Sequence, residues 1–175
     1  MYRTQVNSAT VNWYNADMVT SRSVDVDDLL LDRQLCFALH AASRAVVREY
    51  SPLLGDLGLT YPQYVTMMAL WQEPGRSHTV GELGETVQMD SGTLTPLLKR
   101  LERDGLVTRA RDSVDERRVN VALTAAGLAL RERAAGVPRS MAMRFGLTLD
   151  EMRALKAQLE RLTTTLAGEQ PDREP

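Results

Sequence analysis

MDSGTLTPLLKRLERD, residues 89–104, has the pattern of a short helix with one apolar and one polar face. Its leucines recur at steps of three and four residues, which places them on one side of a helix: Leu94, Leu97, Leu98 and Leu101. Asp90 or Ser91 can cap the start, and Gly105 stands where a helix ends in a left-handed residue. The other positions present hydroxyl groups and cations: Ser91, Thr93, Thr95, Lys99, Arg100 and Arg103.

A helix of this kind suits the major groove of DNA. Hydroxyl groups can reach base edges and phosphates, and cations can meet the phosphate backbone. The alternative is an ordinary solvated helix face, and the flanking segments favour the groove. Pro96, in the second turn, removes one backbone hydrogen bond, so we expect a local distortion there without a break.

The flanking segments complete a winged helix-turn-helix, an α+β fold that is mostly α. Before the helix, Thr79 and Glu82 have the spacing of a capping box at the start of a shorter helix. The link between the two helices, Gln88–Met89, lacks the glycine common in such turns. After the second helix, residues 106–112 and 119–124 alternate as strands do, and the charged segment between them should be an exposed hairpin tip.

The composition is that of an ordinary globular protein with a locally basic segment. The 175 residues are 43% hydrophobic and 25% charged, and the formal net charge is −2. Residues 1–92 carry a net charge of −5, whereas residues 93–118 carry +2. A basic segment on an acidic body is compatible with a sequence-specific DNA-binding protein and weighs against a non-specific nucleic-acid coat.

The single cysteine excludes an intramolecular disulfide and a cysteine-rich zinc site. With only two histidines in the chain, we expect neither a metal nor a cofactor. No apolar run has the length of a membrane span, and the N-terminus lacks the pattern of a signal peptide. We therefore expect a cytoplasmic protein without a membrane partner.

Long helices with apolar stripes are expected on both sides of a DNA-binding lobe that spans residues 60–124. They cover residues 28–50 and 125–167, the second region being interrupted at Gly136–Pro138, and Ser51-Pro52 should open a short helix after the first. Such helices are typical of dimerisation, and a homodimer would read a pseudo-palindromic site in double-stranded DNA. The predicted divisions are a flexible tail (1–26), one domain (27–167) and a disordered C-terminus (168–175).

Several motifs resemble one family of regulators. Asp115-Glu-Arg117, followed by Leu123-Thr124-Ala-Ala-Gly127, resembles the wing and the wing exit of the MarR family of dimeric transcription regulators. LCFALHAASR (35–44), LTYPQY (59–64) and DSGTLTPLLKRLE (90–102) are similar to its organic-hydroperoxide-sensing branch, OhrR. The resemblance covers roughly residues 28–165.

The resemblance implies that Cys36 is the sensor. In that branch two tyrosines, here Tyr50 and Tyr61, bond the reactive cysteine across the dimer interface, and His40 stands where several relatives have a tyrosine. The chain is similar to the one-cysteine type, in which a low-molecular-weight thiol captures the sulfenic acid. The chemistry agrees, because the thiolate and not the thiol reacts with an organic hydroperoxide, and oxidation makes the group larger and more polar. This change should bias the dimer towards release of its operator.

The resemblance also implies a role for the wing. Arg117 matches the family position that enters the minor groove, and Arg118 is a further candidate. Asp115 is expected to orient Arg117, because phosphates repel a carboxylate. Lys99, Arg100 and Arg103 are expected to contact phosphates more than bases.

Two other functions are compatible with the residues. In the first, a small phenolic or aromatic carboxylate ligand releases the regulator from DNA, and Cys36 is a small buried apolar residue; Tyr50 and Tyr61 are then ordinary packing residues. In the second, the chain is an enzyme such as a one-cysteine thiol peroxidase. We do not favour an enzyme, because no basic residue adjoins the Cys36 motif and no catalytic pattern is recognised.

Overall fold

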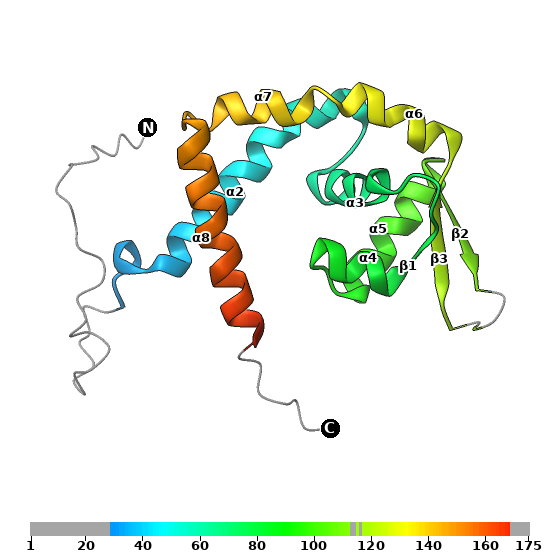
Figure 1. Cartoon of the computed structure of the whole chain (residues 1–175), viewed down its shortest axis with the longest axis horizontal. Coiled ribbons are helices and arrows are strands. Elements are labelled where there is room, and N and C mark those ends of the chain that lie inside the picture. Colours follow the sequence, from blue (N-terminus) through cyan, green and yellow to red (C-terminus); the bar gives the residue numbers. More distant parts are fainter. Residues whose placement is uncertain (1–28, 113–114, 116, 169–175) are drawn as a thin grey trace. The chain divides into compact units, whose positions relative to one another are not determined.

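The computed structural model describes residues 29–112, 115 and 117–168, so the predicted tail of residues 1–26 and all but the first residue of the predicted disordered C-terminus lie outside the described residues (Figure 1). The chain divides into two compact units, Met1–Val46 and Val47–Pro175. The boundary falls inside the long helix α2, Leu35–Leu54.

The first unit holds one turn of 3-10 helix, η2 (Leu31–Arg33), and the first part of α2. The helix begins later than the expected start at residue 28, because Leu30 and Gln34 have extended backbone with ψ values of 126° and 115°. It also ends later than the expected residue 50. Pro52 lies inside its last turn and, unlike in our prediction, starts no new helix.

The second unit contains the predicted winged helix-turn-helix. The elements after α2 are η3 (Gly55–Leu57), α3 (Tyr61–Gln72), β1 (His78–Thr79), α4 (Val80–Val87), α5 (Ser91–Arg103), β2 (Val107–Arg111), β3 (Val119–Leu123), α6 (Ala125–Ala134), α7 (Val137–Arg144) and α8 (Leu149–Gly168). The region expected to be helical after the wing thus forms three helices, with the predicted interruption between α6 and α7.

The sheet has the strand order β1-β3-β2, and both pairings are antiparallel. β2 and β3 form the predicted hairpin, with partners running from Val107 and Leu123 to Arg111 and Val119. β1 pairs through His78 with Val121 and was not predicted, because two residues are too few to show a period of two. β3 is therefore the middle strand and anchors the wing.

Side-chain caps fix where the helices of the lobe begin. The predicted capping box is confirmed, since the Thr79 hydroxyl accepts a hydrogen bond from the Glu82 amide while the Glu82 carboxylate accepts one from the Thr79 amide. Thr60 caps α3 in the same way, and Thr148 caps α8. These caps satisfy amides that have no partner inside the helix.

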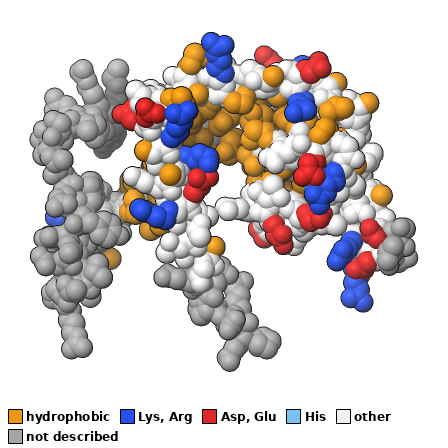
Figure 2. Space-filling view, in the orientation of Figure 1, with side chains coloured by type: hydrophobic (Ala, Val, Ile, Leu, Met, Phe, Trp, Pro, Cys, Tyr) orange, Lys and Arg blue, Asp and Glu red, His pale blue; other side chains and the backbone are white. Residues whose placement is uncertain are grey.

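The core of the second unit lies between α3, α4, α5 and the sheet. Its fully buried side chains include Leu54, Tyr64, Met67, Leu70, Leu83, Leu94, Leu98, Leu101, Val107 and Val121. On the face drawn in Figure 2, apolar side chains gather in the upper middle of the view, and charged side chains lie beside the wing at the lower right. Among the helices that the structure describes, none combines the length and apolar character needed to cross a membrane.

Gly127, near the start of α6, lies against the backbone of the residue that enters β2. A Cβ at this position would stand 2.0 Å from the carbonyl oxygen of Leu106. The Gly127 amide donates to the Thr124 hydroxyl (3.0 Å), and its carbonyl accepts from the buried indole of Trp71 (2.9 Å). The glycine of the wing-exit motif therefore joins α6, α3 and the hairpin at one point.

Gln88 ends α4 in the left-handed region, with φ 54° and ψ 46°. A residue with a Cβ is strained there, and glycine is not, although glycine loses more entropy on folding. We expect Gln88→Gly to raise the free energy of unfolding by about 0.5–1 kcal/mol. Glu85→Gly, in the helical interior of α4, should lower it by about 1 kcal/mol. Urea unfolding of both variants checks this, and a Gln88→Gly protein less stable than wild type would contradict it.

Candidate nucleic-acid interface and cysteine site

Helix α5 has the two faces expected from its sequence. Its four leucines are at most 8% exposed, whereas Ser91, Thr93, Lys99, Arg100 and Arg103 are exposed and Thr95 is half-buried. Asp90 caps the helix, Gly105 follows it with φ 72°, and the helix runs through Pro96 without a break. The division into an apolar and a polar face is confirmed, and contact of the polar face with DNA stays a prediction.

A carboxylate lies at the N-terminal end of this polar face. The Asp90 carboxylate accepts hydrogen bonds from the hydroxyl (2.7 Å) and the amide (2.9 Å) of Thr93. These two bonds hold the pKa of Asp90 below its ordinary value, so the group is ionised at neutral pH. The hydroxyl proton of Thr93 is thus engaged within the protein, and towards a base this side chain can act only as an acceptor.

The cations of α5 differ in their partners. Arg103 forms an ion pair of 3.0 Å with Asp104, and Glu102 pairs at 3.3 Å with Arg109, whose side chain is 16% exposed. Among the residues that the structure describes, Lys99 and Arg100 have no such partner. Their charges are therefore fully available to phosphates.

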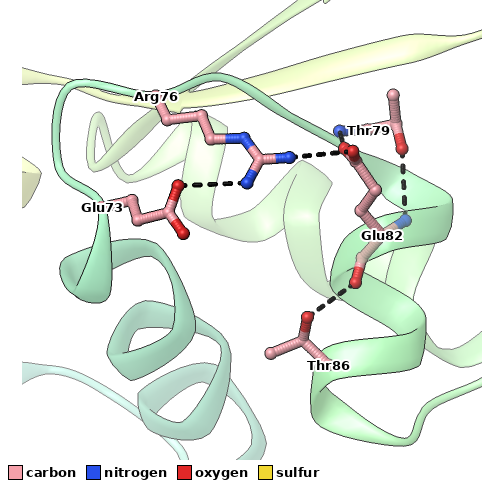
Figure 3. Close-up of polar contacts among 5 residues, drawn as sticks. All are labelled: Glu73, Arg76, Thr79, Glu82 and Thr86. Carbon is pink, nitrogen blue, oxygen red and sulfur yellow. Dashed lines mark hydrogen bonds and ion pairs between the residues drawn. The ribbon is translucent and has the colours of Figure 1, made fainter.

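The helix that precedes α5 is tied to the end of α3 by a network drawn in Figure 3. The guanidinium of Arg76 bonds Glu73 and Glu82, each at 3.0 Å. The Glu82 carboxylate also accepts a hydrogen bond from the Thr79 amide at 2.7 Å. The backbone carbonyl of Glu82 accepts one from the Thr86 hydroxyl at 2.8 Å. Each ion pair is exposed and contributes little alone, and together they link Glu73 at the end of α3 to Glu82 in the first turn of α4.

Hydrogen bonds from threonines at the starts of three helices lower the pKa of three nearby carboxyl groups. For Glu82 the causes are the Thr79 amide and hydroxyl and then Arg76; for Asp90 and Glu151 they are Thr93 and Thr148. Because the pKa values of these carboxyl groups are lower in the folded than in the unfolded state, the ionised carboxylates stabilise the fold at pH values above the ordinary carboxyl pKa. This stabilisation is lost as pH falls through that range and below it.

We therefore expect the free energy of unfolding to decline below about pH 4.5. In Glu82→Gln this decline should be shallower, because an amide cannot be protonated. Gln63 shows that glutamine serves in a capping box of this chain. Urea unfolding at neutral and acidic pH checks the result, with Glu85→Gln, outside the capping box, as the control. If both variants show the wild-type pH dependence, the hydrogen bonds of the Glu82 carboxylate do not contribute to the free energy of unfolding.

The two arginines of the wing, Arg117 and Arg118, immediately precede β3. Asp115 accepts a hydrogen bond from the backbone amide of Arg117 (3.1 Å) and pairs with the Arg118 guanidinium at 3.6 Å. It thus holds the backbone of Arg117, while its ion pair goes to Arg118. Both arginines are exposed, and they border a cleft of about 440 Å³ together with Glu82 and Glu85 of α4.

The predicted cysteine site falls in two parts. Cys36 is the second residue of α2, lies in the first unit and is exposed. Tyr50 and Tyr61, in the second unit, are brought together with ring centroids 4.7 Å apart. Burial, and then Tyr61, raise the pKa of Tyr50, so its phenol remains a hydrogen-bond donor at neutral pH.

Two functional candidates were not found in the sequence. Tyr64 lies 5.8 Å from Tyr50 between ring centroids, and burial raises its pKa to about 12. Asp112 and Asn120 meet at the base of the wing tip through a 2.8 Å hydrogen bond. A tyrosine at helical spacing predicts core packing and nothing more, and a contact between two strands leaves no periodic signal.

Comparison with known proteins finds transcriptional regulators as relatives of this chain. Residues 48–132 match the family model "Transcriptional regulator SarA/Rot". The chain is 42% identical to the organic hydroperoxide resistance transcriptional regulator of Bacillus subtilis, over 80% of this chain and 94% of that protein. It is 49% identical to the HTH-type transcriptional regulator TtmR of Methylorubrum extorquens, over 78% of this chain and 69% of that protein.

A solved structure of a relative is also similar. Reduced AbfR bound to DNA superposes with a TM-score of 0.67 and 33% sequence identity, over 81% of this chain and 97% of that one. AbfR is a protein of Staphylococcus epidermidis. Two of these relatives are named as transcriptional regulators, and the third is a protein seen on DNA.

Proposed function

The chain belongs to the MarR family of winged helix transcription regulators, in its organic-hydroperoxide-resistance branch, and from this premise we propose that it is a dimeric repressor which releases its operator when a hydroperoxide oxidises Cys36. The observation that carries the proposal is the single, exposed cysteine in the second position of α2.

The DNA-binding part of the proposal rests on α5 and the wing. The exposed hydroxyls and cations of α5 enter a major groove, with Lys99 and Arg100 on phosphates, and Arg117 enters the adjoining minor groove. The support is that Lys99 and Arg100 have no ion-pair partner among the described residues, together with the similarity to AbfR bound to DNA. Ser91, Thr93, Thr95, Arg103 and Arg118 are the further proposed contacts.

The dimer is supported by apolar side chains that the single chain leaves exposed. They lie in both units: Leu31, Leu35, Phe37, Met143, Phe145, Leu149, Leu155, Leu159 and Leu166. So many large exposed apolar side chains are unusual for a monomer and typical of an interaction surface. A second copy of the chain would bury them and place two recognition helices for a pseudo-palindromic site.

The redox part follows from thiol chemistry. The thiolate sulfur of Cys36 attacks an oxygen of the hydroperoxide, the O–O bond breaks, and the alcohol leaves with a proton from solvent. The sulfenic acid then condenses with a low-molecular-weight thiol to form a disulfide and water. Leu35 and Phe37, both exposed, flank Cys36 and favour an organic over an inorganic peroxide.

In the dimer we place Tyr50 and Tyr61 of one protomer at the cysteine of the other. Their phenol hydroxyls donate hydrogen bonds to the thiolate, and the larger oxidised group displaces them. This shift changes the spacing of the two recognition helices and weakens the operator complex.

The test is fluorescence anisotropy on a duplex selected from random DNA by the wild-type protein. Wild type and Cys36→Ser are titrated with cumene hydroperoxide in the presence of cysteine. We expect wild type to release the duplex with at least about a tenfold loss of affinity, which corresponds to roughly 1.4 kcal/mol, and Cys36→Ser to stay bound. Hydrogen peroxide, the control oxidant, should act more slowly.

Equal behaviour of the two proteins would overturn the sensing role of Cys36. Release of both by an aromatic carboxylate such as salicylate would then identify a ligand-controlled regulator. Failure of the wild type to select any duplex would overturn DNA binding itself.

A further inference from the structure

Asp112 and Asn120 form a polar pair at the base of the wing tip that no role described so far requires. The Asn120 side-chain amide donates to one carboxylate oxygen of Asp112 at 2.8 Å. The other oxygen accepts the backbone amide of Asp115 at 3.1 Å. Both side chains are half-buried, so neither is displayed as a direct DNA contact.

Asn120 connects this pair to the central strand of the sheet. Asn120 lies in the middle strand, with Thr79 of β1 as its register partner on one side and Ala110 of β2 on the other. Asp112 immediately follows β2, and its backbone amide donates to the carbonyl of Arg118 at 3.0 Å. The carboxylate of Asp112 therefore stands at a fixed point beside the sheet.

A chain of hydrogen bonds runs from this point to Arg117. Asp112 holds the amide of Asp115, and the Asp115 carboxylate holds the amide of Arg117 at 3.1 Å. The carbonyl of Asp115 also accepts from the amide of Arg118 at 2.9 Å. Asp112 and Asp115 thus connect the backbone of Arg117 to Asn120 of the middle strand through consecutive hydrogen bonds.

Resting on the proposed function, we propose that Asp112 and Asn120 are positioning residues that hold Arg117 in the direction in which it enters the minor groove. A long side chain on an ordered backbone loses less entropy on binding than one on a loose hairpin. Placing Arg117 before the encounter strengthens its contact without adding a charge to the surface. A pair that only stabilised the hairpin would affect folding and leave the Arg117 contact unchanged.

A double-mutant cycle on the selected duplex separates these roles. Asn120→Ala should weaken binding about fivefold and Arg117→Ala by about tenfold or more, in the range measured for lost arginine contacts. In the Arg117→Ala background, Asn120→Ala should cost less than about twofold, because nothing remains to be positioned. Thr108→Ala removes another hydrogen bond of the same hairpin, to the carbonyl of Ala122, and should not couple to Arg117.

If Asn120→Ala does not fold, exchanging the side chains of Asp112 and Asn120 still tests the proposal. Asn120→Asp alone puts two carboxylates at the present 2.8 Å contact and should weaken binding more than Asn120→Ala. Adding Asp112→Asn restores one donor and one acceptor at the unchanged total charge, so affinity should return to within about twofold of wild type.

Additive effects of Asn120→Ala and Arg117→Ala, or an exchanged pair that folds and still binds weakly, would overturn the positioning role. A wild-type protein that binds no duplex would instead overturn the proposed function, so the two failures are distinguishable. Thermal unfolding of each variant shows whether a loss of binding is a loss of fold.

Discussion

Gly127→Ala is expected to lower the free energy of unfolding of the second unit by about 3 kcal/mol, at the upper end of the cost of overpacking. The added Cβ would lie 2.0 Å from the carbonyl oxygen of Leu106 and 3.0 Å from its carbonyl carbon. Both are backbone atoms, so no side chain can rotate away. Moving α6 outward would stretch the bond from the Trp71 indole and the cap from Thr124.

Gly136→Ala is the matched control for this substitution. A Cβ there meets no atom within 4 Å, and the backbone at φ −80° and ψ −17° suits any residue. This variant should be slightly more stable than wild type, by about 0.5 kcal/mol. Urea unfolding of the two proteins measures the contrast. Equal stabilities would mean that the α6–hairpin contact relaxes without cost.

Leu159→Glu is expected to convert the proposed dimer into a monomer. It should reduce affinity for the selected duplex by about 100-fold or more, because the two DNA-binding lobes then bind their half-sites separately. Leu155, Leu159 and Leu166 leave 46%, 40% and 61% of their surfaces exposed in the single chain. Burying a carboxylate between the apolar faces of two copies costs roughly several kcal/mol.

Gln158→Glu adds the same charge at the neighbouring exposed position and should leave both properties unchanged. Sedimentation equilibrium gives the mass of each variant, and anisotropy gives its affinity. A Leu159→Glu protein that remains dimeric and binds as wild type would exclude Leu159 of α8 from the interface.

The sequence was most informative where structure is set by near neighbours. The faces of α5, its Asp90 cap and the Thr79–Glu82 box each depend on residues within one or two turns, and all three were predictable. The start of α2 was not, because a separate 3-10 turn, Leu31–Arg33, precedes it.

Contacts between distant residues were beyond the reach of local patterns. Nothing in the wing-exit motif says that Gly127 meets the backbone of Leu106, and the pairing of Asn120 with Asp112 depends on the register of the hairpin. For the cysteine site the resemblance supplied Tyr50 and Tyr61, and the structure places their rings side by side. No local pattern distinguishes Tyr64 from an ordinary core residue.

Trp71 also provides an intrinsic fluorescence probe of the DNA-binding lobe. The chain has two tryptophans, and the other, Trp13, precedes the described residues. Trp71 is 6% exposed. Its ring centroid lies 6.3 Å from that of Tyr64, so excitation energy absorbed by Tyr64 is transferred to Trp71. In a Trp13→Phe protein, a shift of emission to longer wavelength would report the moment at which water reaches the joint between α3 and α6. The protein thus carries its own spectroscopic label, at the joint with Gly127 where the largest loss of stability is expected.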